Sequence, residues 1–560
     1  MKFKKASDRD NYIPEKFSSI REMVDLAVAE AGDKDAYRFR KGRSDEIEHV
    51  TFRQFKDDQE NLGAALTELG YGSSHIAVMS ENRYEWINAY VTVLKSAGVV
   101  VPIDRELPVA DKITVLNDSD SEVLIFSTKY SSFVKENKDK LPNIKLYINF
   151  DAEEDEADSG ILSYKKLIAH GAELDKTAYD SLKSDENDLK SLVYTSGTTG
   201  MAKGVMLSEH NLCCLVYYGL LVSGKGDVGL SVLPFHHTYE ANAGILVCIH
   251  THSTICINNS LRNIVKDLQL FKPEFVQVVP ALLEFIYNSI LKNIKAQGKE
   301  KTFNNALKLS ETLRKVGIDQ RRKIFSSIHE TFGGNLNQIV CGGAALRPEV
   351  GEFFEKIGIL VQNGYGITEC SPIVAVNDVK SVRWDTAGHR LECIEWKIDQ
   401  PNEEGIGEIL VKGDTVMLGY YKQPEKTAEV FEDGWFHTGD YGKFTKDEQI
   451  MITGRKKNII VLNNGKNIYP EEIEGYIAGI SYVTEVIVKS IKDDKNEEIG
   501  LLAEIYIGEE SDRKQLAEGR ILDDIHRTMK ELPSYKQVTE VVIRDTPFDK
   551  TTSNKIKRTY

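Results

Sequence analysis

The alternation of short apolar runs with helix-like stretches constrains the fold of this 560-residue chain most strongly. An apolar run at residues 75–79 is followed by a helix-like stretch over 84–96 and by a second apolar run over 98–103. Two further apolar runs occupy residues 123–126 and 146–150. Strands that alternate with helices are typical of a parallel sheet with helices on its faces. The sequence therefore predicts an α/β fold.

The pattern changes twice in the second half of the chain. Between residues 383 and 453 the segments become shorter and strand-like, with glycine-marked turns, which predicts a small β-rich subdomain. After Arg455 strand-like and helix-like segments alternate again. Because 560 residues exceed one ordinary core, we expect two domains. These are a large N-terminal domain over residues 1–454, with parallel-sheet subdomains and the β-rich part, and a small α+β domain over 455–560.

Composition excludes several classes of protein. The net charge of -15 argues against a general nucleic-acid binder, which needs clustered Lys and Arg. The seven cysteines form no C-x-x-C pair, so neither a disulfide framework nor a zinc site is indicated, and we expect reduced thiols. The first residues lack the apolar region of a signal peptide, and no run of about 18 apolar residues predicts a transmembrane segment. We therefore expect a cytoplasmic protein.

A glycine-rich loop follows the strand-like residues 192–194. It combines three glycines with four hydroxyl side chains and a lysine. Such a loop suits phosphate, because glycine lets backbone N–H groups approach an anion, hydroxyls donate hydrogen bonds and lysine supplies charge. It is not a Walker loop, since Lys203 is followed by Gly204, and a purely structural turn is the alternative. The candidate phosphate ligands are Thr195, Ser196, Gly197, Thr198, Thr199, Gly200 and Lys203.

Residues 194–204 closely resemble the signature of the adenylate-forming superfamily, which contains acyl-CoA synthetases, luciferases and the adenylation domains of peptide synthetases. Further segments resemble the remaining family motifs, in the family's order. They are PFHH at 234–237, GGAAL at 342–346, GYGITE at 364–369, TGD at 438–440, GRKK at 454–457 and KTTSNK at 550–555. Within the superfamily, residues 233–240 and 458–474 look most like bacterial long-chain acyl-CoA ligases.

The resemblance implies an enzyme that uses ATP and Mg²⁺ to convert a carboxylic acid into its acyl-adenylate. By this resemblance Glu369 and Thr198 hold Mg²⁺ through hard oxygen ligands, and Thr368 contacts phosphate. His236 resembles the residue beside the acyl carboxylate, although its neighbour His237 is an alternative. An ordinary surface glutamate is the competing interpretation of Glu369.

The nucleoside contacts are implied in the same way. Tyr365 would stack on adenine, and the small or backbone-exposing residues Gly343, Ala344 and Gly366 would let the ring approach. Core packing is the alternative role for them. Asp440 would accept hydrogen bonds from both ribose hydroxyls, with Arg455 as its partner.

The C-terminal domain would contribute Lys555, which lies about a hundred residues beyond the large domain. By resemblance Lys457 is a hinge, about which the small domain turns to replace Lys555 with the loop of Gly465 when the thiol of coenzyme A enters. The sequence departs from the family pattern at Ala202, Asn464 and Asn554, and none of these changes removes a charged catalytic group.

We predict that the acid is a medium- or long-chain fatty acid and that coenzyme A accepts the acyl group. Two alternatives remain open, an acyl carrier protein as acceptor or no acceptor, and a non-catalytic sensor of nucleotide or acyl groups. The sequence also leaves peripheral membrane contact open.

Overall fold

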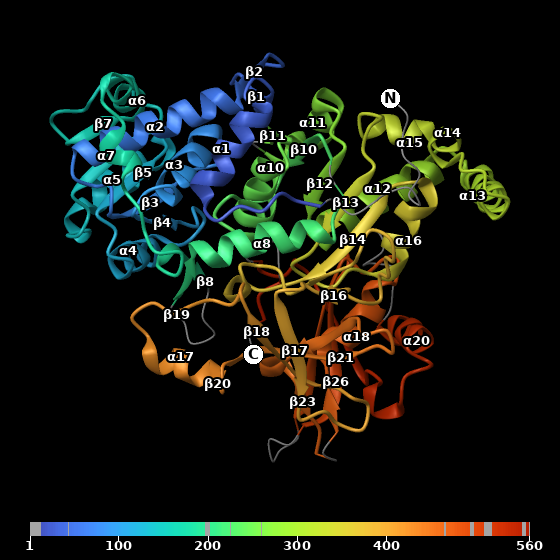
Figure 1. The fold of residues 1–560 in the computed structure, drawn as a ribbon. Coiled ribbons are helices and arrows are strands. Elements are labelled where there is room, and N and C mark those ends of the chain that lie inside the picture. The colour runs from blue at the N-terminus through green and yellow to red at the C-terminus, as the bar shows by residue number, and fades with distance from the viewer. Residues whose placement is uncertain are drawn as a thin grey trace. The chain divides into compact units, whose positions relative to one another are not determined.

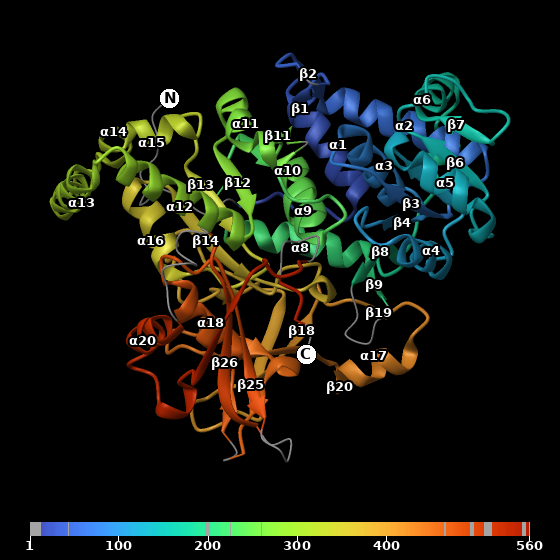
Figure 2. The same cartoon turned by 180° about the vertical axis from the view of Figure 1, so that it is seen from behind.

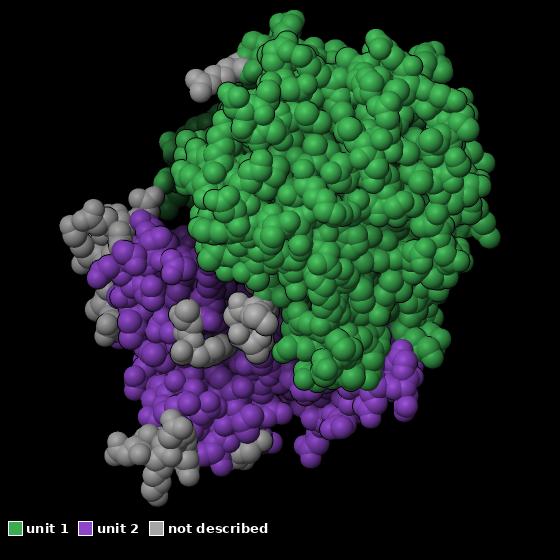
Figure 3. Space-filling view, turned by 90° about the vertical axis from the view of Figure 1, so that its left-hand side faces the viewer, with its two compact units in different colours: residues 1–384, 388–395, 412–431 green, residues 385–387, 396–411, 432–560 purple. Residues whose placement is uncertain are grey.

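A computed structural model of the protein describes residues 13–42, 44–195, 202–224, 226–258, 260–463, 466–492, 498–508, 518–550 and 556–558. The chain divides into two compact units, shown in different colours in Figure 3. Unit 1 comprises residues 1–384, 388–395 and 412–431, and unit 2 comprises residues 385–387, 396–411 and 432–560.

Unit 1 contains an eight-stranded sheet. Its central strands are apolar runs buried on both faces, as parallel strands between helices require. The order is β19-β9-β8-β4-β3-β5-β6-β7, and the strands from β8 to β7 run parallel. The bounds are β3 His75–Met79, β4 Val99–Pro102, β5 Val123–Phe126, β6 Leu146–Asn149, β7 Ile161–Ser163, β8 Leu189–Thr195, β9 Lys203–Ser208 and β19 Gly419–Tyr420.

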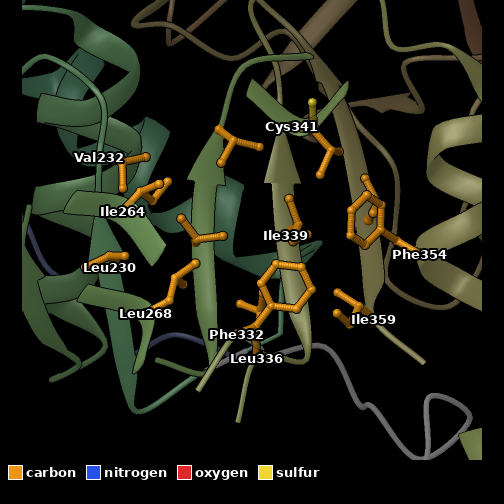
Figure 4. Packing of buried hydrophobic residues seen from close by; sticks show 14 of the residues in the cluster. Leu230, Val232, Ile264, Leu268, Phe332, Leu336, Ile339, Cys341, Phe354 and Ile359 are labelled. Carbon is orange, nitrogen blue, oxygen red and sulfur yellow. The ribbon is translucent and has the colours of Figure 1, made fainter. Parts of the chain in front are cut away.

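A nine-stranded sheet forms the rest of unit 1, in the order β16-β15-β14-β13-β12-β10-β11-β1-β2. The six strands from β14 to β1 are parallel, so their carboxyl ends share one edge. The bounds are β1 Asp35–Arg40, β2 Ile47–Thr51, β10 Val228–Ser231, β11 Thr254–Ile257, β12 Phe275–Val278, β13 Gln338–Cys341, β14 Leu360–Tyr365, β15 Ala375–Val376 and β16 His389–Arg390. Figure 4 shows its core, in which Leu230 and Ile339 of the sheet pack with helical residues such as Leu268.

Helices flank both sheets of unit 1 (Figures 1 and 2). Capping boxes begin two of them, with Thr51 and Gln54 at α2 and Ser208 and Asn211 at α8. No helix of the described residues is both long and apolar enough to cross a membrane. The longer helices are α1 Ile20–Ala31, α2 Phe52–Glu68, α3 Tyr84–Leu94, α4 Val109–Asp118, α5 Ser131–Asn137, α6 Tyr164–Glu173, α8 Glu209–Leu221, α11 Ile264–Phe271, α12 Pro280–Ala296, α13 Glu300–Lys315, α16 Pro348–Ile357 and α17 Pro424–Val430. The shorter ones are α7 Thr177–Asp180, α9 Thr238–Glu240, α10 Val247–His250, α14 Arg321–Ile324 and α15 Ser326–Thr331.

Unit 2 is rich in β-structure. A five-stranded sheet, most of which lies in this unit, has the order β17-β18-β21-β20 with β22 paired to β21. A two-stranded ribbon and a three-stranded sheet follow. The bounds are β17 Ile394–Asp399, β18 Gly407–Gly413, β20 Phe431–Glu432, β21 Trp435–Phe444, β22 Ile450–Arg455, β23 Ile460–Val461, β24 Asn467–Ile468, α18 Pro470–Ala478, β25 Glu485–Lys492, β26 Glu498–Tyr506, α20 Glu518–Thr528 and β27 Glu540–Arg544.

The predicted α/β class and the β-rich segment are confirmed. Helix α20 spans Glu518–Thr528 and ends before the helix-like pattern of the sequence does, because the apolar residues Met529 and Leu532 pack on the same core after the helix has ended. By packing, residues 396–411 and 432–453 of the β-rich segment belong to unit 2 with the C-terminal residues, whereas residues 388–395 and 412–431 belong to unit 1. The predicted boundary after residue 454 separates the large N-terminal domain from a C-terminal domain that moves, and this division stays a prediction.

Candidate active site

The glycine-rich loop connects β8 to β9 as the tip of an antiparallel hairpin. Thr195 and Lys203 face each other in register at the base of this loop. Ser196, Gly197, Thr198, Thr199 and Gly200 lie outside the described residues. The hairpin therefore fixes both ends of the predicted phosphate loop.

The side chain of Tyr420 contacts both Lys203 of the glycine-rich loop and the predicted magnesium ligand Glu369. The ammonium of Lys203 lies 4.7 Å from the centroid of the Tyr420 ring. The Tyr420 hydroxyl donates a hydrogen bond of 3.0 Å to Oε1 of Glu369. Burial and then the Glu369 carboxylate raise the pKa of Tyr420, so the phenol remains a proton donor.

Glu369 suits a hard cation. Among the described residues no hydrogen bond reaches its second carboxylate oxygen, Oε2, and the side chain is only half-buried. A side chain with one carboxyl oxygen held by a phenol and the other open is a fitting ligand for Mg²⁺. The turn that presents it, Thr368–Cys370, is secured by the Met417 amide, which donates to the Glu369 carbonyl at 2.8 Å.

The predicted adenine residues follow the carboxyl ends of two adjacent parallel strands. Gly343 and Ala344 come just after β13, and Tyr365 ends β14, with Cys341 and Asn363 in register between the strands. Gly343 has a φ of +87°, which glycine adopts without strain. A side chain at Gly366 would collide with the Pro372 carbonyl, at 1.7 Å. The structure thus places this group at one sheet edge.

His236 lies where the two sheets of unit 1 present their carboxyl ends. It follows β10, and its Nε2 is 3.4 Å from Oδ1 of Asp104, which follows β4 of the other sheet. Burial, then His237 and Arg105, lower the pKa of His236 well below its ordinary value, so the imidazole is neutral at pH 7. The His237 ring lies 4.4 Å away, so both candidate histidines occupy this position.

Asn82 clamps the chain that carries His236. Its side-chain amide donates to the Leu233 carbonyl at 2.7 Å, and its oxygen accepts from the Phe235 amide at 3.2 Å.

Just beyond this loop, Glu240 is buried and accepts a hydrogen bond from Ser231. Burial raises the pKa of Glu240 to about 8. A one-turn π-helix, Ala241–Leu246, follows, a form often found at functional sites.

Unit 2 contains the predicted ribose residues. Asp440 and Arg455 face each other on β21 and β22, and Nε of Arg455 lies 2.7 Å from Oδ1 of Asp440. Asp440 is buried, whereas Arg455 is partly exposed. Beside them, buried Glu408 contacts Lys456 at 2.7 Å and His437 at 3.2 Å. Burial opposes ionisation of Glu408, but these two partners hold its pKa below the ordinary value.

The predicted hinge and the residues of the second half-reaction also fall in this unit. Lys457 lies in a 3₁₀ turn directly after β22 and is exposed. Gly465 and Lys555 lie outside the described residues. The chain on either side of residues 551–555 is anchored, because Lys550 contacts Glu485 at 2.8 Å and Arg558 contacts Glu474.

Sequence reasoning missed Tyr420, Asn82, Asp104 and Glu408. Tyr420 and Glu369 are 51 residues apart, and Asn82 is 151 residues from Leu233, so no local pattern connects them. The one available signal is position, because Asn82 and Asp104 each follow the end of a predicted parallel strand, where ligands bind in α/β sheets.

The β8–β9 hairpin, the Glu369 turn and the glycine-containing segments at the ends of β13 and β14 are those of an adenylate-forming fold. Residues 24–421 match the family model described as AMP-binding enzyme, and the chain belongs to that family. The long-chain-fatty-acid–CoA ligase FadD15 of Mycobacterium bovis is 30% identical over 463 residues, which cover 78% of this chain and 75% of the relative. Long-chain-fatty-acid–CoA ligase 5 of Rattus norvegicus is 28% identical over 596 residues, covering 98% and 86%.

A solved structure supports the fold independently. The anthranilate CoA ligase AuaEII, determined in complex with anthranoyl-AMP, superposes with a TM-score of 0.78 at 20% identity. The match covers 99% of this chain and 97% of that one.

Proposed function

We propose that this enzyme activates a medium- or long-chain fatty acid with ATP, forming acyl-adenylate and pyrophosphate, and then transfers the acyl group to coenzyme A with release of AMP. The observation that carries the proposal is the meeting of Lys203 and Glu369 at the Tyr420 ring, beside a hydroxyl-rich loop. A cation and a hard carboxylate in this position suit a triphosphate with its Mg²⁺. The similarity to long-chain ligases supports the choice of acid.

In the first half-reaction the fatty carboxylate attacks the α-phosphate, and pyrophosphate leaves. Glu369 and Thr198 would hold Mg²⁺, which supplies positive charge as the two anions approach. Lys203 and Thr368 would bind phosphate oxygens, together with Thr195, Ser196, Gly197, Thr199 and Gly200 of the loop. Tyr420 would keep the Glu369 carboxylate oriented.

Nucleoside and acid would be bound by separate groups. Tyr365 would stack on adenine over the surface left by Gly343, Ala344 and Gly366. Asp440, held by Arg455, would accept from the ribose hydroxyls. Neutral His236 would lie beside the fatty carboxylate and donate a hydrogen bond without needing to be charged in a buried place.

The second half-reaction would use a different arrangement of the C-terminal part of the chain. We propose that residues 455–560 turn about Lys457, so that Lys555 leaves the α-phosphate and the Gly465 loop meets coenzyme A.

All seven cysteines lie in the described residues and none forms a disulfide, which supports the reducing cytoplasm as the location.

Steady-state kinetics over acetate, octanoate, palmitate and benzoate tests the substrate. We expect the highest kcat/KM with octanoate or palmitate, and a highest value with acetate or benzoate would refute the choice. Thioester formation with coenzyme A, compared with holo-acyl carrier protein, tests the acceptor. Glu369→Gln should abolish adenylation, whereas Glu349→Gln, at an exposed position on α16, is the matched control.

A further inference from the structure

Three potential metal ligands converge at the surface of unit 1, away from the residues assigned above. His210 and Cys214 lie one turn apart on α8, and Asp414 follows β18. One ligand atom from each side chain lies within 4.8 Å of the other two. Residues four apart on a helix share a face, so the backbone itself aims the imidazole and the thiol the same way. The sequence signal for zinc, a C-x-x-C pair, could not reveal this group.

Two of the three distances between the ligand atoms match those around a coordinated cation, and the third is within 4.8 Å. Nε2 of His210 lies 3.4 Å from Oδ1 of Asp414 and 3.5 Å from Sγ of Cys214. Zinc bonds of about 2.0–2.3 Å in a tetrahedron place neighbouring ligand atoms about 3.3–3.8 Å apart. A hydrogen-bonded Asp–His–Cys relay would use the two different ring nitrogens. Here Nε2 is the ring nitrogen nearest to both partners, but Sγ also lies 3.9 Å from Nδ1 and is therefore beside the ring, so the imidazole must rotate for Nε2 and Sγ to face one cation.

The surroundings hold these ligands in place and leave them accessible. Asn211 donates to the backbone carbonyl of Asp414 at 2.7 Å, and the Asp414 amide donates to the Cys393 carbonyl at 3.2 Å. These contacts fix the backbone that carries Asp414. The side chains of His210 and Asp414 are 36% and 51% exposed, so an ion can reach them from solvent.

We propose that His210, Cys214 and Asp414 form a Zn²⁺ site, with water or another neighbouring group as the fourth ligand. Nitrogen, thiolate and carboxylate together favour a borderline cation such as zinc over Mg²⁺ or Ca²⁺. Burial raises the pKa of the Cys214 thiol to about 12, so the thiol is not a reactive nucleophile by itself, and the bound cation displaces its proton.

The site would stabilise the segment that supports Glu369. Residue Asp414 leads directly into Met417, whose amide holds the Glu369 carbonyl, and Thr415, whose carbonyl accepts from the Ser371 hydroxyl at 2.8 Å. A cation bound between α8 and Asp414 would therefore tie this segment to the helix. Zinc binding is a property of these three residues and does not depend on the proposed reaction.

Binding to the untagged, metal-free full chain tests the proposal, with Zn²⁺ and Co²⁺ as probes. We expect one Zn²⁺ per chain and, with Co²⁺, a sulfur-to-cobalt charge-transfer band with the visible absorption of tetrahedral cobalt. Cys214→Ala should remove the band and weaken Zn²⁺ binding by at least about tenfold. Cys213→Ala, at the buried neighbouring thiol on the same helix, should keep both.

Asp414→Asn provides a second variant at an exposed position, which changes the charge with little change of shape. It should also weaken Zn²⁺ binding by about tenfold or more and retain the sulfur-to-cobalt band. Zn²⁺ should raise the thermal unfolding temperature of the parent and not that of Cys214→Ala. Absence of stoichiometric binding, or equal affinity in the parent, Cys214→Ala and Asp414→Asn, would overturn the proposal.

Discussion

Glu240 is a buried carboxyl group whose replacement by glutamine should make the protein less sensitive to pH. The residue is 2% exposed and accepts a hydrogen bond from Ser231. Burial raises its pKa from the ordinary 4.5 to about 8. Glutamine has nearly the same shape and carries no charge in either the folded or the unfolded state. Glu240→Gln therefore removes the titration and keeps most of the packing.

The direction in which the free energy of unfolding changes with pH follows from proton binding. Because the folded pKa of Glu240 lies above the unfolded pKa, the folded protein binds more protons between pH 4.5 and about 8. The free energy of unfolding thus falls as the pH rises through this range, and the loss is complete above about pH 8. At 1.36 kcal/mol for each pKa unit, the full loss is up to about 5 kcal/mol, of which about 3 kcal/mol has occurred at pH 7.

Urea unfolding of parent and variant at pH 5, 6, 7 and 8 measures this effect. Unit 1 and unit 2 need not unfold together, so the comparison uses the transition that reports on unit 1. The free energy of unfolding of Glu240→Gln, relative to that of the parent, should rise by several kcal/mol, at most about 4, between pH 5 and pH 8. Exposed Glu173→Gln on α6 is the control and should follow the parent. Equal pH slopes for the parent and Glu240→Gln would refute the reasoning.

Three further substitutions test the assigned roles. Asp440→Ala should raise the KM for ATP, because each lost hydrogen bond to a charged group costs about 1.5–3 kcal/mol, and an unchanged KM with normal turnover would contradict the ribose assignment. Lys457→Pro should spare adenylation and slow thioester formation, since a fixed φ hinders the turn, and single-turnover assays with equal losses in both steps would indicate general damage. Lys555→Ala should slow pyrophosphate exchange by about 10²–10³-fold while transfer from supplied acyl-AMP continues. Exchange within about threefold of the parent, less than 1 kcal/mol, would make Lys555 a solvated tail residue.

Strands β3, β4, β5 and β6 of unit 1 could be predicted because each lies in an apolar run that is almost wholly buried. The segment 75–79 became β3 and 123–126 became β5 with the same bounds as predicted. Helix ends were less accurate, since apolar residues such as Met529 pack on the core whether or not they are helical. The local sequence pattern thus predicts well which residues are buried, and it predicts poorly where helices and strands end.

The candidate site was predictable only where a motif is continuous in sequence. The glycine-rich loop and the turn of Glu369 were found in this way, as were the two separate motifs that contain Asp440 and Arg455, which the structure joins at 2.7 Å. Tyr420, which contacts both Lys203 and Glu369, belongs to no such motif. The same holds for Asp414, 200 residues from Cys214, because only the folded chain brings them together.

Isotope transfer tests the central claim, acyl-adenylate formation, most directly. The enzyme would be incubated with ATP, Mg²⁺, coenzyme A and a fatty acid labelled with ¹⁸O in its carboxylate, and the products analysed by mass spectrometry. Because a carboxylate oxygen attacks the α-phosphate and the thiol then expels AMP, one ¹⁸O should appear in AMP for each thioester formed. Unlabelled AMP, or label in inorganic phosphate alongside ADP, would contradict the account.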